Sequence, residues 1–161
     1  MKTPKISVIM SVYNGMPFLA EAVDSILGQT YKNFEFIIVD DASQDGTWKY
    51  LKSIKDKRIK LLHNPKNLGV AKSLNLALKT STGNYAARMD SDDISLPTRF
   101  QEQAQFLEKH KEYILVGSQV QWIDEKKHLS KGFDVPQADA QIRKKLIWKN
   151  QIHHATVMFR K

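Results

Sequence analysis

The sequence of 161 residues contains no cysteine and no long hydrophobic run. The first absence excludes disulfides, zinc–thiolate sites, iron–sulfur clusters and thiol nucleophiles. The second argues against a membrane-spanning helix, which needs roughly 20 consecutive apolar residues. The seven glycines all lie more than ten residues apart, so the sequence has neither a G-x-G-x-x-G loop nor a Walker A loop. A nicotinamide cofactor or a P-loop is therefore not expected.

Residues 1–5 lead directly into an apolar, β-like stretch, a pattern too short for a signal peptide. We therefore expect a cytoplasmic protein. With 42% hydrophobic and 26% charged residues, the composition is that of a globular domain, and the length favours a single one.

Lysine and arginine outnumber aspartate and glutamate by 25 to 17, which gives a formal net charge of +8. Such an excess is compatible with nucleic acid, anionic lipid headgroups or anionic small molecules as partners. Basic residues gather within residues 49–60 and 143–149, whereas six of the 17 acids fall within residues 40–45 and 90–93. Acidic runs in a basic chain need a specific explanation.

The hydrophobic pattern alternates between strands and helices. Nearly continuous apolar runs predict buried strands at residues 5–12, 34–39, 58–62 and 85–89. Apolar residues at helical spacing follow each of them, near residues 18–27, 48–54, 70–78 and 97–107. The last third predicts a strand at 113–123, a polar hairpin at 124–132, a helix at 137–148 and a final strand at 152–159. This order predicts the α/β class, with a mostly parallel sheet between two layers of helices.

Polar residues follow three of the predicted strands at their carboxyl ends. They are Ser11, Tyr13 and Asn14, then Asp40 and Asp41, then Asp90, Ser91, Asp92 and Asp93. Ligands of open α/β sheets bind outside the carboxyl ends of the strands. If these strands are neighbours, their acids repel one another unless a cation lies among them. Oxygen ligands favour Mg²⁺ or Mn²⁺ together with phosphate oxygens, so the pattern predicts a metal-assisted site for a nucleoside diphosphate.

Three other interpretations stay open from the pattern alone. Residues 41–43 and 91–93 could simply cap the helices that follow them. The run Asp90-Ser91-Asp92 also matches the D-x-D of a haloacid-dehalogenase-like phosphatase, although that family has Thr or Val where Ile94 stands and a more apolar strand before it. The basic surface alone suits a nucleic-acid-binding module, but few aromatic residues are interleaved with the basic clusters.

Several ordered segments resemble the motifs of family 2 glycosyltransferases. The resemblance lies in residues 6–14 (ISVIMSVYN), 25–31 (SILGQTY), 35–47 (EFIIVDDASQDGT), 67–69 (NLG), Asn75 and 90–93 (DSDD). Together these segments extend over residues 5–100. The resemblance implies a GT-A fold, a nucleotide-sugar donor that we expect to be UDP-linked, a divalent metal (Mn²⁺ or Mg²⁺) and inversion at the anomeric carbon.

Carried over position by position, the resemblance implies a role for each candidate residue. Ser11, Tyr13 and Asp41 would contact the nucleoside, with Tyr13 against the base and Asp40 supporting that pocket. Asp90 would lie near the ribose, Asp92 would ligate the metal, and Asp93 would assist the metal or hold the loop. This chain has Leu74-Asn75 where the family often has Arg-Asn, so Lys72 is the candidate phosphate or base neighbour. Asn14, Asn75 and Ser91 complete the nucleotide-sugar-binding set, and His154 matches a position on the acceptor side.

An inverting transfer also needs a general base to deprotonate the acceptor hydroxyl. In the family this carboxylate follows the strand that resembles residues 152–159, so we expect a catalytic domain that stops before its base. The resemblance implies a glycan or lipid-linked acceptor in cell-surface polysaccharide synthesis, and no nucleic acid partner. The basic residues within 49–60 would then allow peripheral contact with an anionic membrane.

Overall fold

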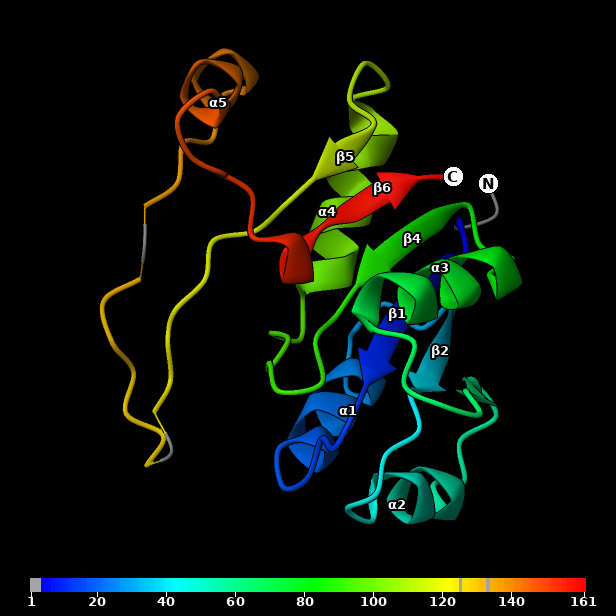
Figure 1. Ribbon diagram of the computed structural model, residues 1–161. Coiled ribbons are helices and arrows are strands. Elements are labelled where there is room, and N and C mark those ends of the chain that lie inside the picture. Colours follow the sequence, from blue (N-terminus) through cyan, green and yellow to red (C-terminus); the bar gives the residue numbers. More distant parts are fainter. Residues whose placement is uncertain (1–3, 125, 133) are drawn as a thin grey trace.

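The computed structural model describes residues 4–124, 126–132 and 134–161. All of its strands join one sheet, in the spatial order β3-β2-β1-β4-β6-β5 (Figure 1). The elements in chain order are β1 (Ile6–Val12), α1 (Leu19–Leu27), β2 (Phe34–Asp40), α2 (Thr47–Ser53), β3 (Ile59–His63), α3 (Val70–Thr80), β4 (Tyr85–Arg88), α4 (Arg99–Lys109), β5 (Leu115–Val116), α5 (Asp139–Leu146), the 3-10 turn η1 (His154–Thr156) and β6 (Met158–Arg160).

β1 lies at the centre of the parallel part of the sheet. It pairs in parallel with β2 on one side and with β4 on the other, and β3 continues the parallel order beyond β2. β6 runs antiparallel beside β4, and β5 runs antiparallel beside β6. The predicted α/β class with a mostly parallel sheet is confirmed.

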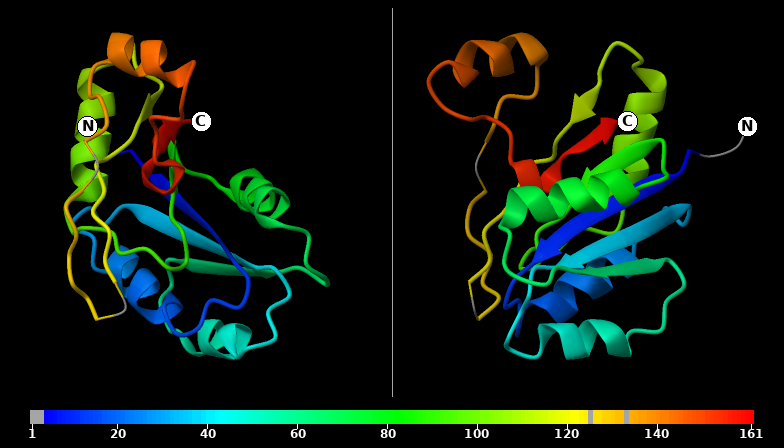
Figure 2. Two further views of the ribbon diagram at one scale, coloured as in Figure 1. Left: turned by 60° about the vertical axis from the view of Figure 1, so that its left-hand side comes forward. Right: turned by 45° about the vertical axis from the view of Figure 1, so that its right-hand side comes forward.

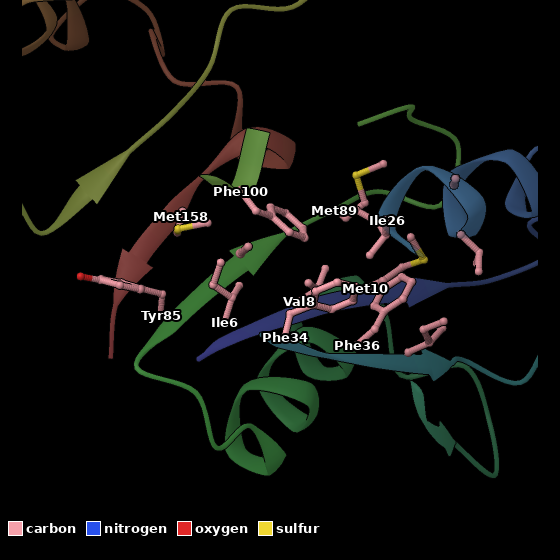
Figure 3. Packing of buried hydrophobic residues seen from close by; sticks show 14 of the residues in the cluster. Ile6, Val8, Met10, Ile26, Phe34, Phe36, Tyr85, Met89, Phe100 and Met158 are labelled. Atoms are coloured by element: carbon pink, nitrogen blue, oxygen red, sulfur yellow. The ribbon is translucent and has the colours of Figure 1, made fainter. Parts of the chain in front are cut away.

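Alternate side chains of the parallel strands enter two hydrophobic clusters, one on each face of the sheet. The larger cluster joins the sheet to α1, α2 and α4, and its members include Val8, Met10, Phe36, Ile26 and Phe100 (Figure 3). The smaller cluster joins the opposite face to α3 through Ile9, Ile37 and Ala77. The helices therefore cover both faces, with α1 and α4 on one side and α3 on the other (Figure 2). This double covering explains why the sequences of β1 and β2 are mostly apolar on both faces.

The last third of the chain departs from the prediction. In place of a strand at 113–123, only Leu115–Val116 pair with β6, and at the expected hairpin Ile123 and Leu129 form an isolated bridge. The predicted helix shortens to α5, and the predicted final strand becomes η1 followed by the three residues of β6. Apolar side chains here stay exposed, among them Trp122 and Leu129. An apolar pattern without a partner strand or a covering layer does not make a stable strand.

The described residues of 117–124, 126–132 and 134–152 belong to an extended arm that leaves the sheet after β5 and carries α5 away from it (Figures 1 and 2). Over the part of the chain that the structure describes, none of the helices combines the length and apolar character needed to cross a bilayer. Residues 1–3, used above to judge the N-terminus, and residue 125 of the predicted hairpin lie outside the described residues.

Candidate functional site

The carboxyl ends of β1, β2 and β4 lie side by side at one edge of the sheet. Val12 is paired with Asp40, and the Asp41 amide donates to the Val12 carbonyl at 2.8 Å. On the other side of β1, the Met89 amide donates to the Ile9 carbonyl at 3.1 Å, so the chain enters the 90–93 run beside β1. The condition stated above, that these strands are neighbours, is therefore met. With one strand between them, β2 and β4 are about 10 Å apart.

The loops that follow β1 and β2 are bonded to each other. The Asn14 amide donates to Ser43 Oγ at 2.9 Å, and the Gln44 amide donates to Asn14 Oδ1 at 2.8 Å. Asn14 and Ala42 both have positive φ, 51° and 65°, which is uncommon for residues other than glycine. These reciprocal bonds position the loop that carries Tyr13, which remains 49% exposed.

Asp41 is buried and holds the loop that leads into α3. One carboxylate oxygen accepts from Asn64 Nδ2 at 2.6 Å and from the Leu68 amide at 2.9 Å, and the other accepts from the Gly69 amide at 2.8 Å. Burial acts to raise the pKa of Asp41, but these bonds and the Ser73 hydroxyl outweigh it and hold the pKa below its usual value. The start of α3 is thereby fixed at the same sheet edge as the loops after β1 and β2.

Asp40 is fully buried next to Asp41 and also points into the protein. Its Oδ2 lies 2.8 Å from His63 Nδ1 and accepts from the Ser43 amide at 3.3 Å. Its Oδ1 has no hydrogen-bond partner among the described residues. The ring of Trp48 packs on His63, with centroids 4.7 Å apart.

The second acidic run, residues 90–93, is called the acidic tip below. Arg88, which is 7% exposed, forms a two-point ion pair with Asp90: Nη2 lies 2.6 Å from Oδ1 and Nη1 lies 2.9 Å from Oδ2. Asp92 and Asp93 are exposed. Even so, partial enclosure by the protein, followed by the charges of Asp90 and Asp92, raises the pKa of Asp93. Asp92 and Asp93 are thus the two carboxylates of the acidic tip that face solvent.

Arg99, the first residue of α4, lies behind the acidic tip. Its Nη2 donates to the Arg88 carbonyl at 2.7 Å, and its Nη1 contacts Met89 Sδ at 3.6 Å. Burial lowers the pKa of Arg99 to about 10, and the charge of Asp93 opposes that shift. Two cations therefore lie behind the acidic tip, and neither was predicted from the sequence. The available signal was Arg88, an arginine in an apolar strand two residues before Asp90.

The acidic tip supplies some, but not all, of the oxygen ligands that a divalent cation needs. Carboxylate oxygens favour Mg²⁺ or Mn²⁺, and a bound cation relieves the repulsion between neighbouring carboxylates. Across residues 4–124, 126–132 and 134–161, however, no three His, Asp or Glu side chains form a ready-made metal cluster. The expectation that the acids of both runs converge on one ion is corrected, because Asp40 and Asp41 point toward His63 and Asn64. The residues fit an ion held by Asp92 and Asp93, with ligand oxygens and water in the other positions.

The remaining predicted nucleotide-binding residues lie on the elements that meet at this edge. Ser11 is half-buried near the end of β1, and Ser91 is half-buried in the acidic tip. Lys72 and Asn75 are exposed on α3, and Lys72 lies in its first turn. Asp41 thus positions Lys72 indirectly, through the loop on which α3 begins.

His154 is exposed in η1, close to β4. The Arg88 amide donates to the Val157 carbonyl at 2.9 Å, which places η1 beside the strand that leads into the acidic tip. The neighbouring His153 has a buried Nε2 without a hydrogen-bond partner among the described residues. The predicted acceptor-side residue therefore lies on the β4 side of the sheet edge, beside the strand that leads into the acidic tip.

Gln29, just after α1, anchors the loop between the acidic tip and α4. Its amide nitrogen donates to Ser95 Oγ at 3.1 Å and to the Leu96 carbonyl at 2.7 Å, and its Oε1 accepts from the Phe100 amide at 3.1 Å. Gln29 is completely buried. A single side chain that follows α1 thus bonds to backbone groups of Leu96 and Phe100, about seventy residues further along the chain.

We expect Gln29→Leu to lower the free energy of unfolding by about 2 kcal/mol, because the buried Phe100 amide and Ser95 hydroxyl and the Leu96 carbonyl lose their partner. Urea denaturation followed by circular dichroism measures this. Gln105→Leu, at an exposed position of α4, is the matched control and should change the value by less than about 0.5 kcal/mol. An equal loss in both variants would contradict the anchoring role of Gln29.

Comparison with known sequences identifies relatives of this architecture. The family model described as "Glycosyl transferase family 2" matches residues 7–161. EpsE of Bacillus subtilis, whose name gives it only provisionally as a glycosyltransferase, is 49% identical over 125 residues, 76% of this chain and 45% of EpsE. WfaP of Escherichia coli, named as a UDP-Glc:alpha-D-GlcNAc-diphosphoundecaprenol beta-1,3-glucosyltransferase, is 42% identical over 106 residues, 66% of this chain and 42% of WfaP. The chain spans less than half the length of these relatives.

The solved structures similar to this one include TarS and PcManGT. The S. aureus TarS 1-349 structure in complex with UDP-GlcNAc has a TM-score of 0.63 at 31% identity, covering 66% of this chain and 32% of TarS 1-349. The mannosyltransferase PcManGT from Pyrobaculum calidifontis, in complex with GDP-Man and Mn²⁺, has a TM-score of 0.72 and covers 99% of this chain and 45% of PcManGT. At 22% identity, the second likeness shows a common fold alone.

Proposed function

This chain belongs to glycosyl transferase family 2, and we therefore propose that it binds a nucleotide-diphosphate sugar and takes part in transferring the sugar to a glycan or lipid-linked acceptor. Its fold is GT-A, as the motifs predicted. The observation that carries the proposal is the adjacency of β1, β2 and β4, which brings Tyr13, the loop held by Asp41 and the acidic tip to one sheet edge. Family membership favours this function over the phosphatase and nucleic-acid interpretations of the same residues.

The nucleoside is proposed to lie between the end of β1 and the loop held by Asp41. Tyr13 offers an exposed aromatic face to the base, and Ser11 and Asn14 add hydrogen-bonding groups beside it. The TarS 1-349 structure is a complex with UDP-GlcNAc, and the name of WfaP specifies UDP-Glc. Both are more than 30% identical to this chain, which supports uridine as the base of the donor.

The diphosphate is proposed to lie over the acidic tip, where Asp92 and Asp93 would hold a divalent metal. Such a metal neutralises negative charge on the leaving diphosphate. Arg88 keeps Asp90 aligned with β4 through their ion pair, so the shape of the acidic tip is set before the donor binds. Lys72 is proposed as a second cation for the phosphates from the α3 side. The general base for inversion is assigned to none of the described residues.

The acceptor is proposed to approach from the side of η1. His154 is exposed there and lies beside the strand that leads into the acidic tip. The name of WfaP specifies a sugar on diphosphoundecaprenol as its acceptor. We extend that class, a glycan carried on a lipid diphosphate, to this chain as a proposal.

Calorimetric titration with UDP, with and without Mn²⁺, tests the donor site. We expect Mn²⁺ to strengthen UDP binding, and we expect Asp92→Asn to weaken the Mn²⁺-dependent binding about a hundredfold, since it removes a charged ligand from the metal. Asp24→Asn removes the same charge at an exposed position of α1 and should bind UDP like the parent chain.

Two outcomes would overturn the proposal. One is the absence of UDP binding under both conditions, combined with salt-sensitive binding of a short oligonucleotide. The other is Mn²⁺-dependent UDP binding that Asp92→Asn and Asp24→Asn weaken equally. Circular dichroism of each variant checks that the fold is retained.

A further inference from the structure

The end of α5 carries the two most exposed large apolar side chains of the described residues. Trp148 is 88% exposed and Ile147 is 79% exposed, while Leu146 beside them is 43% exposed. Four basic residues flank these three. We call the seven residues the α5 tip: Arg143, Lys144, Lys145, Leu146, Ile147, Trp148 and Lys149.

The α5 tip comprises the last turn of α5 and the turn that follows it. The amides of Trp148 and Lys149 both donate to the Lys145 carbonyl, at 3.0 and 3.1 Å. Arg143 is paired with Asp139 at 2.7 Å, whereas Lys144, Lys145 and Lys149 form no ion pair with a described carboxylate. No residue of α5 is buried, and the helix lies away from the sheet on the arm (Figures 1 and 2). The apolar and cationic side chains are therefore available to a partner.

We propose that the α5 tip docks on the surface of an anionic lipid bilayer. Trp148 and Ile147 would enter the headgroup region, where tryptophan is favoured because its ring is apolar and its N–H is polar. The lysines would pair with lipid phosphates. Binding at such a surface increases with the inserted apolar area and with the attraction between basic residues and anionic lipid. The inference rests on the proposed function in one respect, namely that a lipid-linked acceptor lies in a bilayer.

The other basic cluster lacks this combination. Residues 49–60 were expected from the sequence to contact a membrane, but that stretch contains no exposed large apolar side chain. Two of its cations are also engaged, because Arg58 pairs with Asp56 and Lys60 pairs with Glu35. Exposed charge without an apolar anchor gives an attraction that salt screens readily. The membrane contact therefore moves from residues 49–60 to the α5 tip.

Charge and composition favour a bilayer over two other partners. A second copy of this chain also carries a formal net charge of +8, so pairing two α5 tips would bring like charges together. Single-stranded nucleic acid is bound by several aromatic side chains on which successive bases stack, whereas the α5 tip contains one aromatic residue, Trp148. An anionic bilayer supplies both the negative charge and an apolar region for Trp148 and Ile147.

Co-sedimentation of the whole chain with vesicles, without nucleotide, tests the proposal. We expect binding to vesicles of phosphatidylcholine mixed with phosphatidylglycerol, weak binding to pure phosphatidylcholine, and release by added salt. The double variant Ile147→Ser, Trp148→Ser should lower the partition coefficient about tenfold or more, as should Lys144→Glu, Lys145→Glu. The matched control is Lys52→Glu, Lys55→Glu, which makes the same charge change at exposed lysines of the 49–60 cluster and should lose no more than about twofold.

Three outcomes would overturn the proposal: no binding of the parent chain to anionic vesicles, an equal loss in the α5 and control charge variants, or self-association that Ile147→Ser, Trp148→Ser abolishes without any vesicle binding. The last would assign the α5 tip to a second copy of the chain. UDP titration of the same variants keeps the two proposals apart. If the α5 variants lose vesicle binding but keep UDP binding, docking at the α5 tip is supported. If the parent chain binds vesicles but not UDP, the proposed donor site is wrong and the proposed docking surface is unaffected.

Discussion

Asp41→Ala is expected to lower the free energy of unfolding by about 3 kcal/mol, because it removes a buried charged acceptor from three donors at once. The Leu68 amide loses its carboxylate partner outright. Asn64 and Gly69 keep second contacts, with Ser73 at 2.9 Å and Asn67 at 3.1 Å, which limit the loss. Since these bonds fix the start of α3, the variant should also lose hydrogen-exchange protection at Leu68 and Gly69.

Urea denaturation and amide hydrogen exchange measure the two effects of Asp41→Ala separately. Asp24→Ala, at an exposed position of α1, is the control and should change stability by less than about 0.5 kcal/mol. Asp41→Asn keeps the shape but places an N–H donor against a backbone N–H, so we expect it to cost about 2 kcal/mol. Parent-like stability of Asp41→Ala, with the Leu68 amide still protected, would show that the 64–69 loop does not depend on this carboxylate.

The fold of the first 110 residues could be predicted because burial on both faces of the sheet leaves a strong local pattern. Phe34–Asp40 is buried at every position, and it was expected as a strand to within one residue. The strand expected at 113–123 failed for the opposite reason. Ile114 is 74% exposed there, and only Leu115–Val116 find a partner, β6. An apolar pattern predicts a strand reliably only where a second layer covers it.

The candidate site could be predicted to the level of which strand ends meet, but not to the level of where each carboxylate points. Asp40, Asp41 and Asp90 all follow buried strands and look alike in the sequence. In the structure His63, Asn64 and Arg88 engage them, which leaves Asp92 and Asp93 facing solvent. His63, the last residue of β3, and Asn64, which follows it, each lie 23 residues further along the chain than the aspartate they contact. Such contacts depend on how segments distant in the sequence come together in the fold, and a local sequence pattern does not predict this.

A second large effect is expected at Glu35, which lies at the amino end of β2, away from the candidate site. Glu35 is 4% exposed, and its Oε1 accepts from Ser7 Oγ at 2.6 Å and the Thr82 amide at 2.7 Å. Its Oε2 pairs with Lys60 Nζ at 2.7 Å and with Lys5 Nζ at 3.2 Å. We expect Glu35→Gln to lower the free energy of unfolding by about 3 kcal/mol at neutral pH, because both lysines lose a buried anionic partner.

The effect of Glu35→Gln should depend on pH in a defined direction. Burial acts to raise the pKa of Glu35, but the bonds from Lys60, Ser7 and Thr82 outweigh it and hold the pKa well below its usual value of 4.5. The ionised carboxylate therefore stabilises the fold fully above the pKa of the unfolded chain, and this stabilisation is lost as the pH falls toward the lowered folded-state pKa.

Glutamine does not titrate, so the difference in unfolding free energy between the parent chain and Glu35→Gln should be constant from about pH 8 to about pH 5 and shrink below about pH 4.5. Urea titrations at a series of pH values measure it. Glu21→Gln breaks an exposed pair with Lys127 and should stay within about 0.5 kcal/mol of the parent chain throughout. A difference for Glu35→Gln that persisted undiminished to about pH 3 would mean that Glu35 acts through its shape and neutral hydrogen bonds, because part of the charge contribution should already be lost at that pH.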